Sequence, residues 1–377
     1  MNEPLPRWAD LGLLPLINVL VAFAVSGLVV LFVGESPLEA GLLMVEGAFG
    51  SGYNLGYTLY YTTTFIFTGL AVAVAFHCGL FNIGGEGQAT IGGLGVALVA
   101  LSFDATLPFW AIFPLAIAAS MLFGAAWAFI PAWLQAARGS HIVITTIMFN
   151  FIAAGLLVHL LGGVLQASAM GGSRTRAFAE AARMPRIGDT FDWLGLGLGN
   201  TPANITLYLA LVLAFLVWLL IWRTGLGYEI RTMGLSPRAA IYAGIRERRT
   251  IIVTMLISGA LAGATALNLV MGNQSTLTLE FVEGAGFVGI AVALMGRSHP
   301  FGVVLAALLF GALYQGGSEI SFVMGIPRDM IVMIQGLVIL FAGAMEYLFR
   351  PALSRTLATM STTRIQTLPG HGPEPAE

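Results

Sequence analysis

The chain has 377 residues, of which 57% are hydrophobic and only 10% are charged, and its formal net charge is −2. Soluble domains carry about 25% charged residues, so the composition excludes a protein folded in water, and the charge gives no reason to expect a nucleic acid as partner. All 17 basic side chains are Arg and Cys78 is the single cysteine, which excludes a P-loop ATPase within the chain, an internal disulfide and a multi-cysteine metal site.

Long charge-poor stretches predict an all-α polytopic membrane protein with about ten transmembrane helices, one or two of them broken or re-entrant. A helix needs about 20 mostly apolar residues to cross a hydrocarbon core of about 30 Å. In chain order, the predicted spans are 11–33, 58–78, 86–102, 109–133, 142–164, 204–222, 250–270, 285–296, 301–317 and 329–348. The weakest is 285–296, and the sequence leaves open whether it crosses the membrane.

The distribution of Arg predicts that both termini are cytoplasmic. With the N-terminus inside, twelve Arg fall on cytoplasmic segments and five outside, in agreement with the positive-inside rule. The main exception is the loop of about 165–203, which carries four Arg. Residues 1–351 are expected to form the transmembrane domain, and 352–377 a disordered cytoplasmic tail.

The first informative motif is Gly79-Leu-Phe-Asn-Ile-Gly-Gly-Glu-Gly-Gln88, which lies between two apolar spans. Irregular backbone at membrane depth persists only where protein or a water-filled cavity satisfies it. One interpretation is a broken helix beside a translocation path, with Asn82, Glu86 and Gln88 as polar contacts. The other is a tight cytoplasmic turn, with Glu86 as an acid that favours the helix dipole.

The second motif is the basic connection 223–249, which holds six Arg. Its centre, Leu235-Ser-Pro-Arg-Ala-Ala-Ile-Tyr-Ala-Gly244, predicts a short helix capped by Ser236, with Pro237 at the first position and Gly244 at the end. Such a helix favours docking onto a cytoplasmic partner. The alternative is a basic loop that rests on anionic lipid headgroups.

The third motif is Glu283-Gly-Ala-Gly-Phe-Val-Gly-Ile-Ala-Val-Ala-Leu294, which echoes the stretch Glu86–Leu98. Under the predicted topology the two run in opposite directions, a weak indication of the inverted repeats found in transporters. Its Gly-x-Gly-x-x-Gly pattern lacks the βαβ context of a dinucleotide site. We interpret it, like Gly259-x-x-x-Gly263, as small residues for close helix packing.

Neither a metal site nor a catalytic site is expected. The five His are scattered, with no pair on one helical face, and no nucleophile–base–acid set is present. Uncharged polar residues near spans, such as Asn150, either form hydrogen bonds between helices or face a path.

At these segments the sequence resembles the permease subunits of ATP-binding cassette importers for nucleosides and simple sugars, which belong with the branched-chain amino acid and ribose permeases. The motif at Gly79–Gln88 is similar to their G-L-F-N-I-G-x-E-G-Q signature. The segment His141–Ile152 is similar to their N-E-V-I-x-T-x-M-L-N-Y-I, although His141 and Ile142 replace the Asn-Glu pair. The segments 231–245 and 284–302 are similar to their coupling helix and to a later glycine-rich segment.

The resemblance implies a permease of the bacterial inner membrane, with no cofactor on this chain. Its implied partners are a cytoplasmic ATP-binding subunit that hydrolyses ATP, a second permease subunit, the same or a related chain, and an extracytoplasmic substrate-binding protein. It places Asn82, Glu86 and Gln88 near the path, and Phe81 and Asn150 are further candidates for the path. Those that it places at the ATPase are Gly234, Ser236, Pro237, Arg238, Ala239, Ala240, Tyr242 and Gly244.

Two functions of other classes remain open at this point. One is an ion- or proton-coupled secondary transporter that uses Glu86 as its coupling group. The other is a structural membrane subunit with no transport path of its own. The sequence does not identify the substrate.

Overall fold

The computed structural model describes residues 13–167, 172–188, 197–198, 201–327 and 330–337. The chain divides into two compact units, one of Met1–Gly41 with Ile326–Glu377 and one of Leu42–Gly325. The regular elements described are helical, and the only strand-like pairs among these residues are two isolated bridges, Arg174 with Thr278 and Arg186 with Asn204. The predicted all-α polytopic fold is confirmed.

The first unit contains α1 (Leu14–Val33) and the start of α2 (Pro37–Phe49). Helix α1 ends at Gly34, which adopts the left-handed conformation with φ 94°. The chain then bends by 112° between Ala24–Val33 and Pro37–Phe49, so this pair forms a broken span or a re-entrant loop. Within the same unit, Ser26 Oγ donates to the carbonyl of Ile334 at 3.5 Å.

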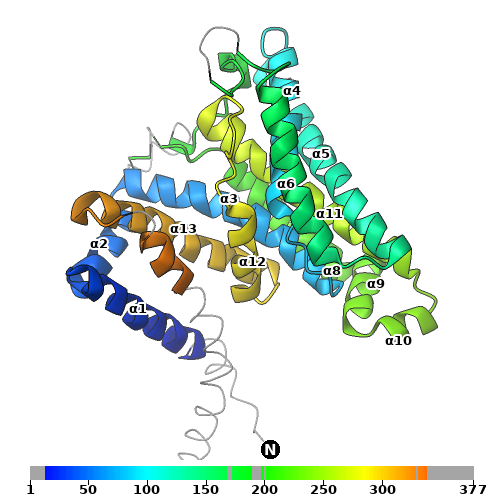
Figure 1. Cartoon of the computed structure of the whole chain (residues 1–377), viewed down its shortest axis with the longest axis horizontal. Coiled ribbons are helices and arrows are strands. Elements are labelled where there is room, and N and C mark those ends of the chain that lie inside the picture. The colour runs from blue at the N-terminus through cyan, green and yellow to red at the C-terminus, as the bar shows by residue number, and fades with distance from the viewer. Residues whose placement is uncertain (1–12, 168–171, 189–196, 199–200, 328–329, 338–377) are drawn as a thin grey trace, which may run out of the picture. The chain divides into compact units, whose positions relative to one another are not determined.

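The second unit holds the remaining helices, which Figure 1 labels in chain order. They are α3 (Gly52–His77), α4 (Gly85–Phe103), α5 (Phe109–Arg138), α6 (Ile142–Leu161), the 3-10 turn η2 (Glu180–Ala182), α8 (Thr206–Arg223), α9 (Gly225–Leu235), α10 (Pro237–Tyr242), α11 (Glu247–Ala266), the π-helix η4 (Leu267–Gln274), α12 (Ala285–Met295) and α13 (Pro300–Met324).

Helices α3 and α11 form the centre of this unit, whereas α5, α6 and α8 leave most of their apolar surface outward. In the most apolar part of each helix, 83% of α3 is buried and 72% of the span that includes α11, against 22% of α5. Close approach of α11 to α5 depends on glycine, because a Cβ on Gly259 or Gly263 would overlap the backbone of Gly124 or Ser120. The predicted packing role of Gly259-x-x-x-Gly263 is confirmed.

Seven helices among the described residues are long and apolar enough to cross a membrane, and the bent pair raises the number to eight. This is fewer than the ten spans predicted. Helix α12 has 11 residues, too few to span. Most of the predicted span 329–348 and all of 352–377 lie outside the described residues, so neither is tested.

The segment 275–299 nevertheless connects the two ends of the helical unit. Its start lies against the loop that follows α6, where the backbone N–H of Leu277 donates to Thr175 Oγ1 at 3.0 Å. Its end lies at the last residue of α3, where His77 Nε2 donates to the carbonyl of Ser298 at 3.0 Å. A first half of bends and turns and a helical half, α12, therefore make up this segment, which explains why 285–296 is the weakest of the predicted spans.

Candidate functional site

The glycine-rich segment between α3 and α4 is held by buried polar side chains. Asn82, which is 1% exposed, donates from Nδ2 to Gln88 Oε1 and to Ser258 Oγ, both at 2.9 Å. Its Oδ1 accepts from the backbone N–H of Gly84 at 2.9 Å. The segment is thus a non-helical connection between two complete helices, held by its own side chains and by α11, rather than a break inside one helix.

Asn150 of α6 holds the same segment from the other side. Its Nδ2 donates to the carbonyl of Ile83, and its Oδ1 accepts from the backbone N–H of Gly87, each at 2.9 Å. A single amide side chain thereby satisfies one backbone donor and one backbone acceptor that the irregular chain leaves without helical partners. Asn150 links α6 to the start of α4.

Glu86 lies in the first turn of α4 but binds the N-terminus of another helix. Its Oε1 accepts from the backbone N–H of Gly284 and its Oε2 from that of Gly286, both at 2.9 Å. These are N–H groups that a helix leaves unpaired at its start, and a negative charge is favourable there. The two segments approach so closely that a Cβ on Gly286 would overlap the backbone of Glu86. Glu86 therefore caps α12 across the interface of the two helices.

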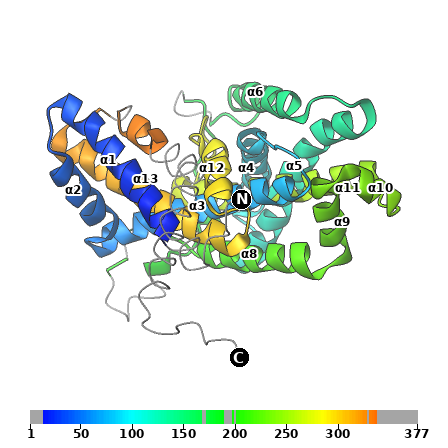
Figure 2. The same ribbon diagram turned by 90° about the horizontal axis from the view of Figure 1, so that it is seen from below.

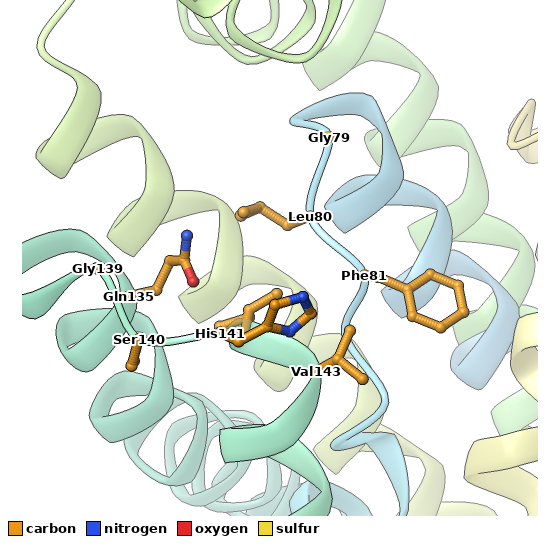
Figure 3. A pocket seen from close by; sticks show the side chains of 9 residues that line it. Gly79, Leu80, Phe81, Gln135, Gly139, Ser140, His141 and Val143 are labelled. Carbon is orange, nitrogen blue, oxygen red and sulfur yellow. The ribbon is translucent and has the colours of Figure 1, made fainter.

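A cavity of about 330 Å³ lies beside the Gly79–Phe81 segment, between it and the connection from α5 to α6. Figure 3 shows Leu80, Gln135 and His141 around this space, whereas the ring of Phe81 points away from Gln135. That ring stacks on Phe76, with centroids 5.2 Å apart. Among the described residues, the buried Gln135 Oε1 and Ser140 Oγ have no hydrogen-bond partner.

The connection between α8 and α11 forms the predicted short helix, α10. Ser236 caps it by accepting from the backbone N–H of Ala239 at 3.4 Å, Pro237 is its first residue, and Gly244 follows its end with φ 82°. Figure 1 shows α9 and α10 together at one end of the unit. Tyr242 of α10 is 96% exposed and Ile241 52%, and Leu235 at the end of α9 is 88% exposed, so this end of the unit presents apolar side chains outward.

Of the residues predicted to line a path, Asn82, Glu86, Gln88 and Asn150 gather around one segment, while the ring of Phe81 turns elsewhere. Of those predicted at a docking surface, the following lie exposed on or next to α10: Gly234, Ser236, Pro237, Arg238, Ala239, Tyr242 and Gly244. Ala240 instead is fully buried. No group of three or more His, Cys, Asp or Glu suited to a metal occurs in the described part of the chain.

Sequence reasoning missed several residues that complete the site. Ser258 Oγ of α11 accepts a hydrogen bond from Asn82 Nδ2 and itself donates to the carbonyl of Ala71 at 2.6 Å. The sequence gives no signal for it, since a serine inside an apolar span is common. Ile241 and Leu235 are also exposed, but the connection 223–249 holds other large apolar residues such as Met233, so the sequence alone does not single them out.

These features define a polytopic membrane permease, with a polar non-helical connection inside the helical unit and an exposed capped helix at one end. Residues 54–343 match the family described as branched-chain amino acid transport system / permease component. The chain belongs to this family. As a permease component it is a multi-pass membrane protein and a transporter subunit, and ATP hydrolysis is not its activity.

Characterised relatives extend over nearly the whole chain. The guanosine ABC transporter permease protein NupP of Bacillus subtilis is 36% identical over 88% of this chain and 93% of its own length. The glucose ABC transporter permease protein TsgB13 of Haloferax volcanii is 32% identical over 93% of this chain and 91% of its own. The nucleoside ABC transporter permease protein NupB of Lactococcus lactis is 32% identical over 92% and 94%.

Proposed function

We propose that this permease imports a nucleoside or a simple sugar, driven by ATP hydrolysis on a separate cytoplasmic subunit. Relatives named for guanosine, nucleosides and glucose support this range of substrates. Nucleosides and sugars are uncharged and rich in hydroxyl groups, so a path with few charged side chains suits both. The chain binds no cofactor of its own.

The observation that carries the proposal is α10. A six-residue helix closed by a side-chain cap and a terminal glycine, with Tyr242 at its end and Leu235 just before its cap almost fully exposed, has the shape of a docking element. Isolated helices this short are unstable in water, so its apolar side chains are best explained by a partner that covers them. We assign that partner as the ATPase, in the cytoplasm.

The remaining arrangement follows from this assignment. Residues 1–351 form the transmembrane domain, both termini and the tail 352–377 face the cytoplasm, and the loop of 165–203 faces a substrate-binding protein outside. A second permease subunit completes the transporter in the inner membrane. Glu86 is poorly suited to couple an ion, because both of its carboxylate oxygens accept backbone N–H groups; this argues against a secondary transporter.

Co-reconstitution with the ATPase, the second permease and the binding protein tests the proposal. ATP should drive accumulation of labelled guanosine or glucose, whereas uptake driven by a proton gradient without ATPase would overturn it. Ser236→Ala removes the cap of α10 and, at about 1 kcal/mol, should lower capture of the ATPase about fivefold. The matched control is Ser51→Ala, which removes the corresponding cap of α3, where Ser51 accepts from Asn54 at 3.1 Å. Equal loss of ATPase capture in both variants would contradict docking at α10.

A further inference from the structure

Three contacts connect the exposed end of the helical unit to α12, and the first is a glycine pair. Gly234, the penultimate residue of α9, lies against the backbone at the end of α3: a Cβ on it would overlap the carbonyl oxygen of His77. In the other direction, a Cβ on Gly79 would lie 3.4 Å from the Cα of Gly234. Backbone meets backbone here, so a shift of α9 and the adjoining α10 has no flexible side chain to absorb it.

The second contact is internal to the segment Gly79–Gly85. Asn82, Gln88 and Asn150 form direct hydrogen bonds that tie this segment to the first turn of α4 and to α6. Fully satisfied polar networks are rigid, so the segment moves as a unit. The cavity of about 330 Å³ that adjoins Gly79, Leu80 and Phe81 gives it room to move.

The third contact is the carboxylate of Glu86 on α12. Figure 2 shows α12 as a short helix beside α3 and α4, and Glu86 binds the backbone of its first turn. The chain on both sides of α12 is strained, because Ser275, Glu280 and Glu283 before it and Arg297 and Ser298 after it have φ between 50° and 54°. Non-glycine residues rarely adopt this left-handed conformation, and it clusters at parts of proteins that switch.

We propose that Glu86 is a positioning residue that ties α12 to the Gly79–Gly85 segment and, through the Gly79–Gly234 contact, to α9 and α10. A displacement of α10 then moves α12, the helical half of the segment 275–299. This inference rests on the proposed function, since it makes Glu86 part of the coupling between ATP hydrolysis and transport rather than a substrate ligand. It predicts that transport and ATP hydrolysis can be separated at Glu86, whose carboxylate oxygens accept backbone N–H groups of α12.

The first test measures molecules transported per ATP hydrolysed in the reconstituted transporter. Glu86→Gln keeps the shape of the side chain but replaces one acceptor by an NH₂ group, and we expect ATP hydrolysis within about twofold of the original chain and transport per ATP about tenfold lower. The matched control is Glu280→Gln, which removes an exposed acid from the segment that leads into α12. Unchanged transport per ATP in Glu86→Gln would overturn the inference.

The second test uses the glycine contact. Gly234→Ala places a methyl group against the His77 carbonyl, whereas Gly225→Ala in the same helix has nothing within 4 Å of the added atom. We expect Gly234→Ala to lower transport per ATP and Gly225→Ala to leave it unchanged. The double variant with Glu86→Gln should lose no more than the more severe single variant, since both interrupt one connection. If the two losses of transport per ATP multiply in the double variant, the two positions act independently, which would contradict the inference.

A spectroscopic measurement decides the matter if Glu86→Gln assembles poorly. Cys78 is buried, so a cysteine introduced at Leu294 of α12, which is 58% exposed, accepts an environment-sensitive label selectively. ATP should change the signal of the label at position 294 in the chain without Gly234→Ala but not in the chain that carries it. A label at position 242 should respond to ATP in both chains. An unaltered response at Leu294 in Gly234→Ala would overturn the inference. If the original chain neither needs nor stimulates an ATPase, the proposed function fails instead, which keeps the two failures distinct.

Discussion

At the scale of single residues, the polar side chains of this permease act mainly on backbone. Glu86, Asn82 and Asn150 each bind main-chain N–H groups that irregular segments or helix starts leave unpaired. A buried backbone group needs such a partner, because water does not reach it. Amide and carboxylate side chains therefore make it possible for the chain to leave the helical conformation where it is buried between helices.

The ion pair between Asp104 and Arg176 at the end of α4 likewise combines a side-chain contact with a hydrogen bond to backbone. Asp104 accepts from Arg176 NH1 at 2.6 Å and NH2 at 2.9 Å, and also from the backbone N–H of Ala179 at 2.9 Å. The hydrogen bonds from Arg176 lower the pKa of the Asp104 carboxyl below its usual range, against burial, which raises it. The pair fixes the loop that follows α6 to the end of α4.

This lowered pKa sets a pH dependence. The contribution of the pair to stability is complete above the unfolded pKa of about 3.9 and is lost as the pH falls through the lower, folded value. Asp104→Asn should lower the free energy of unfolding by about 1 kcal/mol at neutral pH, since Arg176 is half exposed and screened, and should weaken the acid dependence below about pH 4. Thermal denaturation in detergent at several pH values measures both. Glu180→Gln, an exposed acid of the same loop, is the control; equal pH profiles for the two variants would refute the assignment.

At the scale of elements, glycine decides how closely helices approach. Alanine in a helix is normally more stable than glycine by about 0.5–1 kcal/mol, yet at Gly263 the added Cβ would overlap the backbone of Ser120. The same replacement at Gly155 of α6 meets nothing within 4 Å. Whether replacing glycine by alanine stabilises or destabilises the protein therefore depends on how close the neighbouring helix lies.

The two glycines form a matched pair for a stability measurement. Gly263→Ala should destabilise the protein by about 1–3 kcal/mol through overpacking, whereas Gly155→Ala should be neutral or slightly stabilising. Apparent melting temperatures of the purified permease, followed by size-exclusion chromatography after heating, give the comparison. A Gly263→Ala variant as stable as Gly155→Ala would show that α5 and α11 can separate without cost.

At the scale of the whole molecule, the proposed orientation places α10 in the cytoplasm and the loop after α6 outside. Cysteines introduced at Tyr242 and Val164 test it, because these side chains are 96% and 88% exposed and the native Cys78 is buried. In intact cells a membrane-impermeant maleimide should label Val164→Cys alone, and after permeabilisation both. Labelling of Tyr242→Cys from outside would invert the topology and exclude docking of a cytoplasmic ATPase on α10.

The sequence by itself determined the class, the helices and α10, because these depend on local properties: apolar runs of sufficient length, and a cap, a proline and a glycine at fixed positions. It also singled out Asn82, Glu86 and Gln88 as unusual, since polar residues between apolar spans carry a cost. Only the tertiary structure decided what they bind. The partners of Glu86 lie 198 and 200 residues away, and a backbone N–H has no sequence signature. The segment 275–299 was predicted only in its helical half for the same reason: its first half consists of bends and turns held by distant groups such as Thr175, so it needs neither the length nor the unbroken apolarity of a helix.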